Sequence, residues 1–463
     1  MKRARRVSIG AMIRAAAAAT VFTTATAYAR AATPSRAPSP FTMKQVLSYP
    51  YPVEIEASRS GSRVAWIDDR RGARNVWVAE GPAWKARRLT DNASDDGQEL
   101  TQLTFSKDGR SVVWVRGGDH GANWPSPGGI EPNPALGTRK PSIEIWAADF
   151  EKGKAKKIAE GDAPAISPDG KRIAFVKDHQ AWSVPAGGGK AEPLFFCRGE
   201  TGSLAWSPDG KLLAFVSDRG DHSLIGVFSS ADQPVRFIAP STSLDSAPVW
   251  SPDGSRIAFV RQPGRGGAPE PLLADTPQPW SIWVADPASA TAQAAWLSPE
   301  TLEGSVPETD AGISLDWAAG DRLVFLAELD GWPHLYSVPA DGGVPLLLTP
   351  GNFMVDAIAL TPDRKQVVYA ANTGKDADDD DRRHLFRVPV DSASSVEITA
   401  GTGLEWTPTV TGDGSSVFCV SAEARRPPRP AVVPLAGGTL RILAGDEIPP
   451  DFPTDGLVIP RKV

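Results

Sequence analysis

The residues best placed to contact a ligand lie in or beside an insertion rich in glycine and proline, between Gly117 and Pro141. They are His120, Trp124 and Arg139. An aromatic ring and a cation on an exposed loop can bind a peptide through stacking and cation–π contact. An ordinary surface loop would account for the same residues. We therefore treat these three residues as candidate ligand contacts.

A fourth candidate is His334, in the segment GWPHLY. It could face a ligand, but histidine at such a point of a strand more often hydrogen-bonds to neighbouring backbone and holds a turn. The acidic segment DADDDD, residues 376–381, could attract Ca²⁺, yet it lacks the glycine and the spaced ligands of a calcium loop. We interpret it as a solvated hairpin tip, and we predict neither a metal nor another cofactor.

The sequence offers no arrangement for nucleophilic catalysis. An α/β-hydrolase needs the pattern Gly-x-Ser-x-Gly, which holds its serine on a strained turn between a strand and a helix. This pattern is absent, and the nearest segment, GDGSSVF around Ser415, precedes no helical periodicity. We therefore predict no catalytic residue and no activity of the chain on its own.

A repeated phrase indicates the elements that would position the candidates. AISPDGKRIAFV begins at Ala165, AWSPDGKLLAFV at Ala205 and VWSPDGSRIAFV at Val249. Proline presets φ for the second position of a tight turn, aspartate tolerates the third, and glycine takes the left-handed conformation. Because an apolar run follows, each phrase predicts a β-hairpin. The predicted turn residues are Pro168, Asp169, Gly170, Pro208, Asp209, Gly210, Pro252, Asp253 and Gly254.

A third strand, often with an aromatic residue, and a fourth strand follow each hairpin. Four antiparallel strands per repeat form the blade of a β-propeller. We therefore predict an all-β fold, a β-propeller of four-stranded antiparallel blades, with eight blades favoured over seven because the terminal copies of the repeat are degenerate. The turn glycine or its equivalent recurs at Gly61, Gly109, Gly170, Gly210, Gly254, Gly320, Arg364 and Gly414.

The N-terminus has the layout of a secretory signal, in which basic residues precede an alanine-rich apolar stretch. We expect cleavage after Ala29 and a periplasmic or secreted protein, with twin-arginine export as an alternative. A formal net charge of −6 argues against a nucleic-acid partner, and no later stretch is long enough to cross a membrane. The predicted parts are a signal peptide at 1–29, a linker at 30–48, the propeller at 49–450 and a tail at 451–463.

Several of these segments resemble a known family. WSPDGKLLAF and its copies resemble the WD40-like repeats of TolB proteins and of the prolyl oligopeptidase family of serine peptidases. The segment DGWPHLYSVPADGGVPLLLTPG, residues 330–351, is similar to a blade of the dipeptidyl-peptidase-like members of that family. RRGARNVWVAEGP, residues 70–82, is similar to the first blade of bacterial members. The resemblance implies the propeller that precedes an α/β-hydrolase domain, and residues 451–463 resemble the start of the connection to such a domain.

The resemblance also implies a function, the gating or binding of peptides. It suggests a peptide or protein ligand and a separately encoded α/β-hydrolase as partners. The Glu-Glu pair with which dipeptidyl peptidases hold the substrate amino terminus is absent from this sequence. Two alternatives stay open: a TolB-like scaffold that binds other proteins of the periplasm, and an enzyme that acts in the central channel of the propeller.

Overall fold

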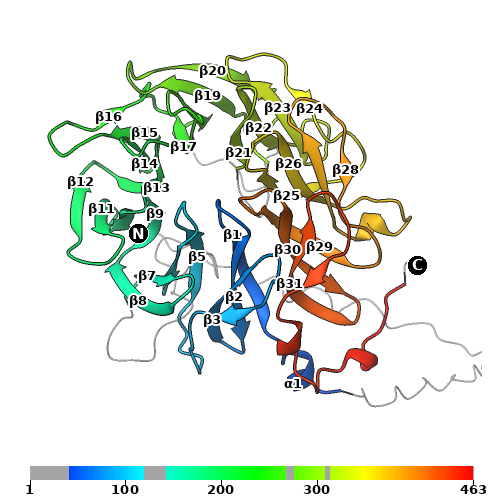
Figure 1. The fold of residues 1–463 in the computed structure, drawn as a ribbon. Coiled ribbons are helices and arrows are strands. Elements are labelled where there is room, and N and C mark those ends of the chain that lie inside the picture. The colour runs from blue at the N-terminus through cyan, green and yellow to red at the C-terminus, as the bar shows by residue number, and fades with distance from the viewer. Residues whose placement is uncertain (1–40, 119–141, 267–275, 308–312, 462–463) are drawn as a thin grey trace, which may run out of the picture. The chain divides into compact units, whose positions relative to one another are not determined.

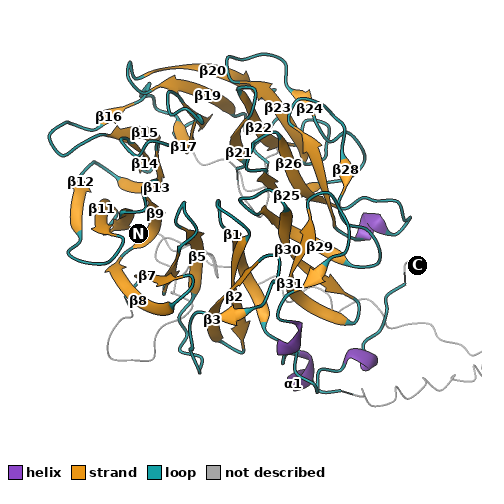
Figure 2. Ribbon diagram, in the orientation of Figure 1, coloured by secondary structure: helices purple, strands orange, loops and turns teal. Residues whose placement is uncertain are grey.

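The computed structural model describes residues 41–118, 142–266, 276–307 and 313–461, and these residues are almost entirely β-strand and turn (Figures 1 and 2). The strands follow the chain in groups of four, and successive strands within a group pair antiparallel. We number these groups meander 1 to meander 8. Four-stranded antiparallel units are what the repeated phrase predicted.

The first four meanders span residues 51–237. Meander 1 contains β1 (Tyr51–Ala57), β2 (Arg63–Arg70), β3 (Ala73–Glu80) and β4 (Arg87–Arg88). Meander 2 contains β5 (Leu100–Phe105), β6 (Ser111–Arg116), β7 (Glu144–Asp149) and β8 (Gly153–Glu160). Meander 3 contains β9 (Asp162–Ile166), β10 (Arg172–Lys177), β11 (Gln180–Pro185) and β12 (Glu192–Phe195). Meander 4 contains β13 (Glu200–Trp206), β14 (Leu213–Asp218), β15 (Ser223–Phe228) and β16 (Arg236–Phe237).

The last four meanders span residues 244–442. Meander 5 contains β17 (Leu244–Trp250), β18 (Ile257–Gln262), β19 (Ser281–Asp286) and β20 (Thr291–Leu297). Meander 6 contains β21 (Leu315–Ala318), β22 (Arg322–Ala327), β23 (His334–Pro339) and β24 (Leu346–Leu347). Meander 7 contains β25 (Val355–Leu360), β26 (Gln366–Ala371), β27 (His384–Pro389) and β28 (Val396–Glu397). Meander 8 contains β29 (Leu404–Val410), β30 (Ser416–Glu423), β31 (Arg426–Pro434) and β32 (Arg441–Ile442).

Meanders 4 and 5 are joined into one sheet by a parallel bridge between Ser223 and Leu244. Each of the other six meanders is a separate four-stranded sheet. The preference for eight blades over seven stays a prediction.

The turn after the first strand has the same geometry in six meanders, namely meanders 2, 3, 4, 5, 7 and 8. In meander 3, Ser167 Oγ donates to Asp169 over 2.7 Å, and the Gly170 amide donates to the Ser167 carbonyl over 2.8 Å. Gly170 has φ +71°, which glycine adopts without steric cost. The turns at residues 207–210 and 251–254 repeat both bonds. Because both bonds lie within the turn itself, the local sequence is sufficient to specify the turn geometry of these hairpins.

The hydrophobic core lies between neighbouring meanders. Eight clusters of buried side chains each draw on two successive meanders, and one of them joins meander 8 to meander 1. The second strand of a meander packs on both faces; Leu213, Ala214 and Phe215 of β14 have no exposed surface. Such burial explains the continuous apolar run after each turn. The described chain therefore forms a ring closed by side-chain packing.

A buried ion pair strengthens the closure between the first and last meanders. Arg429 of β31 is fully buried, and its Nη2 lies 3.3 Å from Oδ2 of Asp68 in β2. The guanidinium also donates to the carbonyls of Pro50 and Ala444, over 2.6 and 3.0 Å. Because a buried charge is stable only when it is paired and hydrogen-bonded, both sides of the closure are needed.

The ring has two distinguishable ends. Strands alternate in direction, so each meander reverses after its first and third strands at one end, which we call the turn end. The chain enters β1 and leaves β32 at the opposite end, which we call the terminal end. There Gln45 Nε2, in α1 (Met43–Val46), donates to the Asp451 carbonyl over 3.3 Å (Figure 1). The other short helices are η1 (Asp379–Asp381), η2 (Gly445–Glu447) and η3 (Thr454–Gly456).

The helices of the described ranges are too short to serve as membrane spans: none of them combines the length and the apolar character that crossing a bilayer requires.

Candidate functional site

Three of the four candidate ligand contacts, His120, Trp124 and Arg139, lie outside the described residues. They belong to the segment that connects β6 to β7. Their role as ligand contacts stays a prediction.

The fourth candidate, His334, begins β23 and has no exposed surface. Its Nε2 lies 3.0 Å from the carbonyl oxygen of Gly351, and its Nδ1 lies 3.2 Å from the hydroxyl of Thr349. The imidazole meets the ring of Phe353 edge to face, with centroids 5.1 Å apart. These contacts hold the segment after β24 against the meander, which favours the structural interpretation of His334.

His384 occupies the matching position at the start of β27, but its partners are charged. Its Nδ1 lies 3.1 Å from a Glu405 carboxylate oxygen and its Nε2 lies 3.3 Å from an Asp379 oxygen. Burial opposes the charged form of His384, but the hydrogen bonds and charges of Glu405 and Asp379 outweigh it and raise the pKa of the imidazole. The interpretation of residues 376–381 as a solvated tip is therefore wrong for Asp379, which is buried beside this histidine.

The first strand of each meander lies nearest the middle of the ring, and we call these the inner strands (Figure 1). Their pairing with the second strands shifts register in most meanders. Beside five of these shifts a non-glycine residue has φ between +48° and +54°: Gln102, Ala163, Ser203, Ala247 and Thr407. Bulges redirect side chains, and such backbone strain is concentrated at functional sites. The inner strands are therefore the strongest candidates for a binding surface.

Polar side chains connect consecutive inner strands. Glu54 of β1 accepts a hydrogen bond from the backbone amide of Leu103 in β5, over 2.8 Å. Gln102 of β5 donates to Asp162 of β9 over 2.9 Å. The bulges therefore place main-chain and side-chain polar groups of one meander against the next along the axis.

Four charged residues form what we call the axial cluster: Glu56, Arg59, Asp316 and Arg364. Burial raises the pKa of Glu56 to about 7, although Arg59 lowers it. Burial likewise raises the pKa of Asp316 to about 6 against the effects of Arg364 and Arg59. Because Arg59 belongs to meander 1 and Asp316 to meander 6, charges of two non-adjacent meanders influence each other.

The axial cluster lies toward the turn end, since Arg59 and Arg364 belong to turns that follow inner strands. Arg364 takes the position of a turn glycine with φ +59°, and its Nη1 donates to the Trp317 carbonyl over 2.7 Å. The cluster combines two carboxyl groups that titrate near neutral pH with two guanidinium groups. Such groups can bind the amides and charged ends of a peptide.

Sequence reasoning missed both the bulges and the axial cluster. A signal for three bulges was present, because Pro164, Pro248 and Pro408 each follow a left-handed residue within a predicted strand. Proline inside a strand indicates an edge or a bulge. Glu56 and Asp316 carry no such signal, since the residues that surround them come from distant meanders.

The comparisons with known proteins agree with this architecture. Residues 284–424 match the family model described as the dipeptidyl peptidase IV N-terminal region. The chain resembles a dipeptidyl peptidase propeller. The resemblance stated from the repeats is thus confirmed, as is the predicted propeller of four-stranded antiparallel units. No curated protein sequence matches the chain.

Solved structures share this fold at low sequence identity. Dipeptidyl peptidase 4 from Porphyromonas gingivalis aligns with a TM-score of 0.60 and 13% identity, over 88% of this chain and 62% of that protein. A puromycin-hydrolyzing peptidase from Mycobacterium tuberculosis aligns with a TM-score of 0.50 and 14% identity, over 75% of this chain and 53% of that protein. The chain therefore spans less than two thirds of either peptidase, and the likeness is one of fold.

Proposed function

We propose that this chain is a non-catalytic, peptide-binding propeller of the dipeptidyl-peptidase-like kind. The axial cluster carries the proposal, because it places carboxyl and guanidinium groups together on the axis of a ring built like the propeller of a peptidase. Peptides entering along the axis would meet acceptors for their amino terminus and donors for their carbonyl and carboxylate groups.

The affinity of the chain for the members of a labelled peptide library tests this function. Glu56→Gln and Asp316→Asn should each weaken binding about tenfold, the loss of one charge-assisted hydrogen bond. Because the pKa of Glu56 is about 7, binding of a free amino terminus should strengthen as the pH rises from about 6 to about 7, and it should gain no more above that, where the amino group itself, with a pKa of about 7.7–8.0, loses its proton. Asp232→Asn, at an exposed position of meander 4, is the matched control. Unchanged binding in both axial variants would contradict the proposal.

The absence of catalysis needs a separate measurement. Peptides incubated with the purified chain should remain intact, and a fluorophosphonate that labels activated serines should not react. Serine labelling together with peptide cleavage would overturn the non-catalytic assignment.

We further propose that the terminal end receives a partner, a separately encoded α/β-hydrolase. Apolar side chains are exposed there: Met43 is 70% exposed, Leu47 is 59% and Val53 is 49%. A cavity of about 320 Å³ lies among Leu47, Tyr49 and Val53. Contiguous exposed apolar surface is typical of a docking site.

A Leu47→Asp/Val53→Asp variant should lose the hydrolase in a pull-down, while the axial variants should keep it. Capture of other periplasmic proteins by the same surface, without peptide binding, would favour the TolB-like scaffold instead.

The N-terminal segment supports a proposal on location, export to the periplasm or beyond. Residues 1–29 should be removed, so N-terminal sequencing of protein recovered from the periplasm should begin at Arg30. Recovery of the unprocessed chain in the cytoplasm would contradict it.

A further inference from the structure

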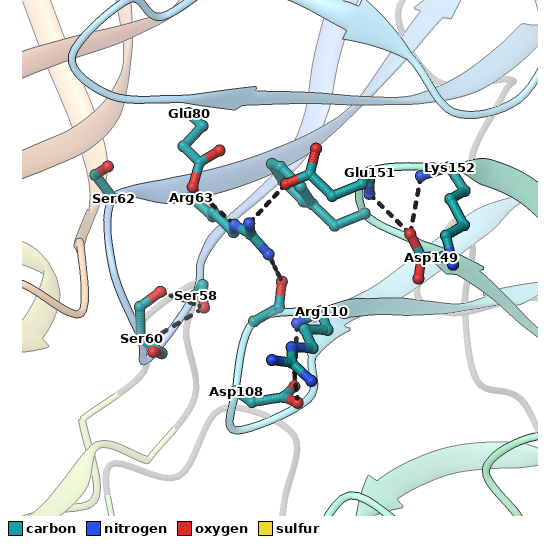
Figure 3. A network of polar contacts seen from close by, with 12 residues as sticks. Ser58, Ser60, Ser62, Arg63, Glu80, Asp108, Arg110, Asp149, Glu151 and Lys152 are labelled. Atoms are coloured by element: carbon teal, nitrogen blue, oxygen red, sulfur yellow. Dashed lines mark hydrogen bonds and ion pairs between the residues drawn. The ribbon is translucent and has the colours of Figure 1, made fainter.

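One arginine fills the space between meanders 1 and 2 at the turn end. Arg63 is the second residue after the turn glycine of meander 1. Its guanidinium donates to the Gly109 carbonyl over 3.0 Å and to Glu151 over 2.7 Å, both in meander 2 (Figure 3). It also lies over the Phe150 ring, 4.4 Å from the centroid. A cation, an acid and an aromatic ring together close this interface, and we call the space the arginine slot.

The same slot recurs between meanders 5 and 6. Arg256 is again the second residue after the turn glycine. It pairs with Asp341 over 2.9 Å and with Asp321 over 2.6 Å, both in meander 6. Its guanidinium lies 5.0 Å from the centroid of the Trp317 ring. The second position after the turn residue is arginine in four of the eight meanders, Arg63, Arg172, Arg256 and Arg322, and the slot described here is found where that arginine meets an acid of the next meander.

Between meanders 4 and 5 the slot has neither its arginine nor its acids. Leu212 occupies the arginine position. Ser255 stands where meander 6 has Asp321, and Ala288 stands where meanders 2 and 6 have Glu151 and Asp341. These three residues line a pocket of about 710 Å³. Pockets that hold small ligands span roughly 300–1,000 Å³, so this one is large enough for side chains of a peptide.

Aliphatic side chains supply much of the pocket wall. Leu212, Val227, Val235 and Pro287 line it. Val227 and Pro287 are buried, while Leu212 and Val235 are partly exposed. An occupant that covers the partly exposed Leu212 and Val235 gains hydrophobic stabilisation.

The charged groups at the pocket edge already have partners. Arg236 donates to the carbonyls of Pro287 and Ala288. Asp286 accepts hydrogen bonds from the Ala288 amide over 2.7 Å and from the Ser289 hydroxyl over 3.0 Å. The preference for an uncharged side chain therefore rests on the aliphatic wall, because both charged residues lie at the exposed edge.

We propose that this pocket binds an uncharged aliphatic or aromatic side chain of an extended peptide. The proposal rests on peptide binding as the function of the chain, but it adds a site distinct from the axial cluster. At the rim, Ser229 and Ser255 are exposed; the Ser255 hydroxyl donates to Asp253 over 2.8 Å, so its oxygen can only accept a bond from the peptide backbone. The pocket lies at the turn end, so a domain docked at the terminal end would leave it open.

Methyl NMR of the full chain, labelled at leucine and valine methyl groups, tests the site. The probe is the acetylated and amidated tripeptide Gly-Leu-Gly, matched against Gly-Lys-Gly and Gly-Glu-Gly. The methyl signals of Leu212, Val227 and Val235 should shift with the leucine peptide alone. Equal shifts with all three peptides, or no shift with any, would overturn the proposal.

A variant that rebuilds the missing ion pair tests the comparison between slots. Leu212→Arg combined with Ala288→Glu should fill the pocket and raise the dissociation constant of the leucine peptide at least about tenfold. Lys211→Arg, at the adjacent exposed position, is the control and should bind normally. If the double variant does not fold, Ser255→Trp blocks the pocket from an exposed position and should have the same effect.

Two further outcomes separate this site from other occupants and from the axial cluster. Glu56→Gln should leave the pocket signals responsive to the leucine peptide. If binding of library peptides is weakened by Glu56→Gln but unchanged in both pocket variants, the axial function stands and the pocket proposal fails. If light scattering finds a dimer that the double variant dissociates, a second copy occupies the pocket and the peptide assignment is wrong.

Discussion

Meanders 6 and 7 place a histidine at the same point and surround it differently. His334 and His384 each begin a third strand, and neither has exposed surface. His334 contacts a carbonyl and a hydroxyl, whereas His384 lies between the carboxylates of Asp379 and Glu405. The repeat therefore determines where the histidine lies. The segments around it determine whether it bonds to uncharged groups or to carboxylates.

The difference arises outside the shared motif. Asp379 comes from the segment between β26 and β27, and Glu405 comes from the inner strand of the next meander. Ser421 of β30 also donates to Glu405 over 3.2 Å. The His384 cluster thus connects the segment between β26 and β27 to meander 8. We expect it to contribute more to stability than the His334 contacts do.

The largest effect is expected for Glu405→Ala. Removing one partner from a buried ion cluster typically costs about 3–5 kcal/mol, because the remaining charge is left poorly compensated. The urea midpoint of unfolding measures this loss. Glu405→Gln keeps the shape and an acceptor and should lose distinctly less; equal loss in both variants would show that packing rather than charge is responsible.

A smaller loss is expected for His334→Ala. Its buried hydrogen-bond partners would lose their donor or acceptor, at a cost of about 1–3 kcal/mol. Thr349→Val removes the hydroxyl that contacts His334 Nδ1 and also accepts from the buried Leu335 amide over 3.0 Å, so its unfolding midpoint should fall by a similar amount. A loss for His334→Ala as large as that for Glu405→Ala would contradict the comparison.

The His384 cluster should also make the stability of the protein depend on pH. The pKa of His384 is raised in the folded state, so its stabilisation is fully present below the unfolded pKa, about 6.5, and is lost as the pH rises through the folded pKa. The melting temperature of His384→Gln should therefore fall less between pH 6 and pH 9 than that of the wild type. Lys211→Arg, an exposed substitution in meander 4, is the control and should keep the wild-type pH dependence, because it leaves the His384 cluster intact.

These two meanders also indicate how far sequence reasoning reached. The turn residues and the continuous apolar second strands could be predicted, because tight turns and buried strands depend on local chemistry. His334 was selected from its motif, but His384 was not, although both histidines precede a leucine and an aromatic residue. The raised pKa of His384 depends on Asp379 and Glu405. The fold brings these two residues to the histidine from the segment before β27 and from the next meander.

The pocket between meanders 4 and 5 escaped prediction for a related reason. Leu212 stands in a phrase that otherwise matches its neighbours closely, so the sequence alone suggests an ordinary repeat. The consequence of replacing an arginine appears only when Arg63 and Arg256 are found to reach into the next meander. A repeat thus predicts the ring well, while the pockets between meanders depend on residues that vary from one copy to the next.

The smallest effect in this series is expected for Asp330→Asn. Its carboxylate lies 3.6 Å from Nε2 of His334 and its side chain is 40% exposed, so solvent screens the interaction. Exposed ion pairs contribute about 0–1 kcal/mol, and the unfolding midpoint should hardly change. Asp379 lies at a similar distance from its histidine, 3.3 Å, but is buried, so Asp379→Asn should destabilise the protein far more. Comparable effects of the two substitutions would mean that burial does not distinguish the two histidine environments.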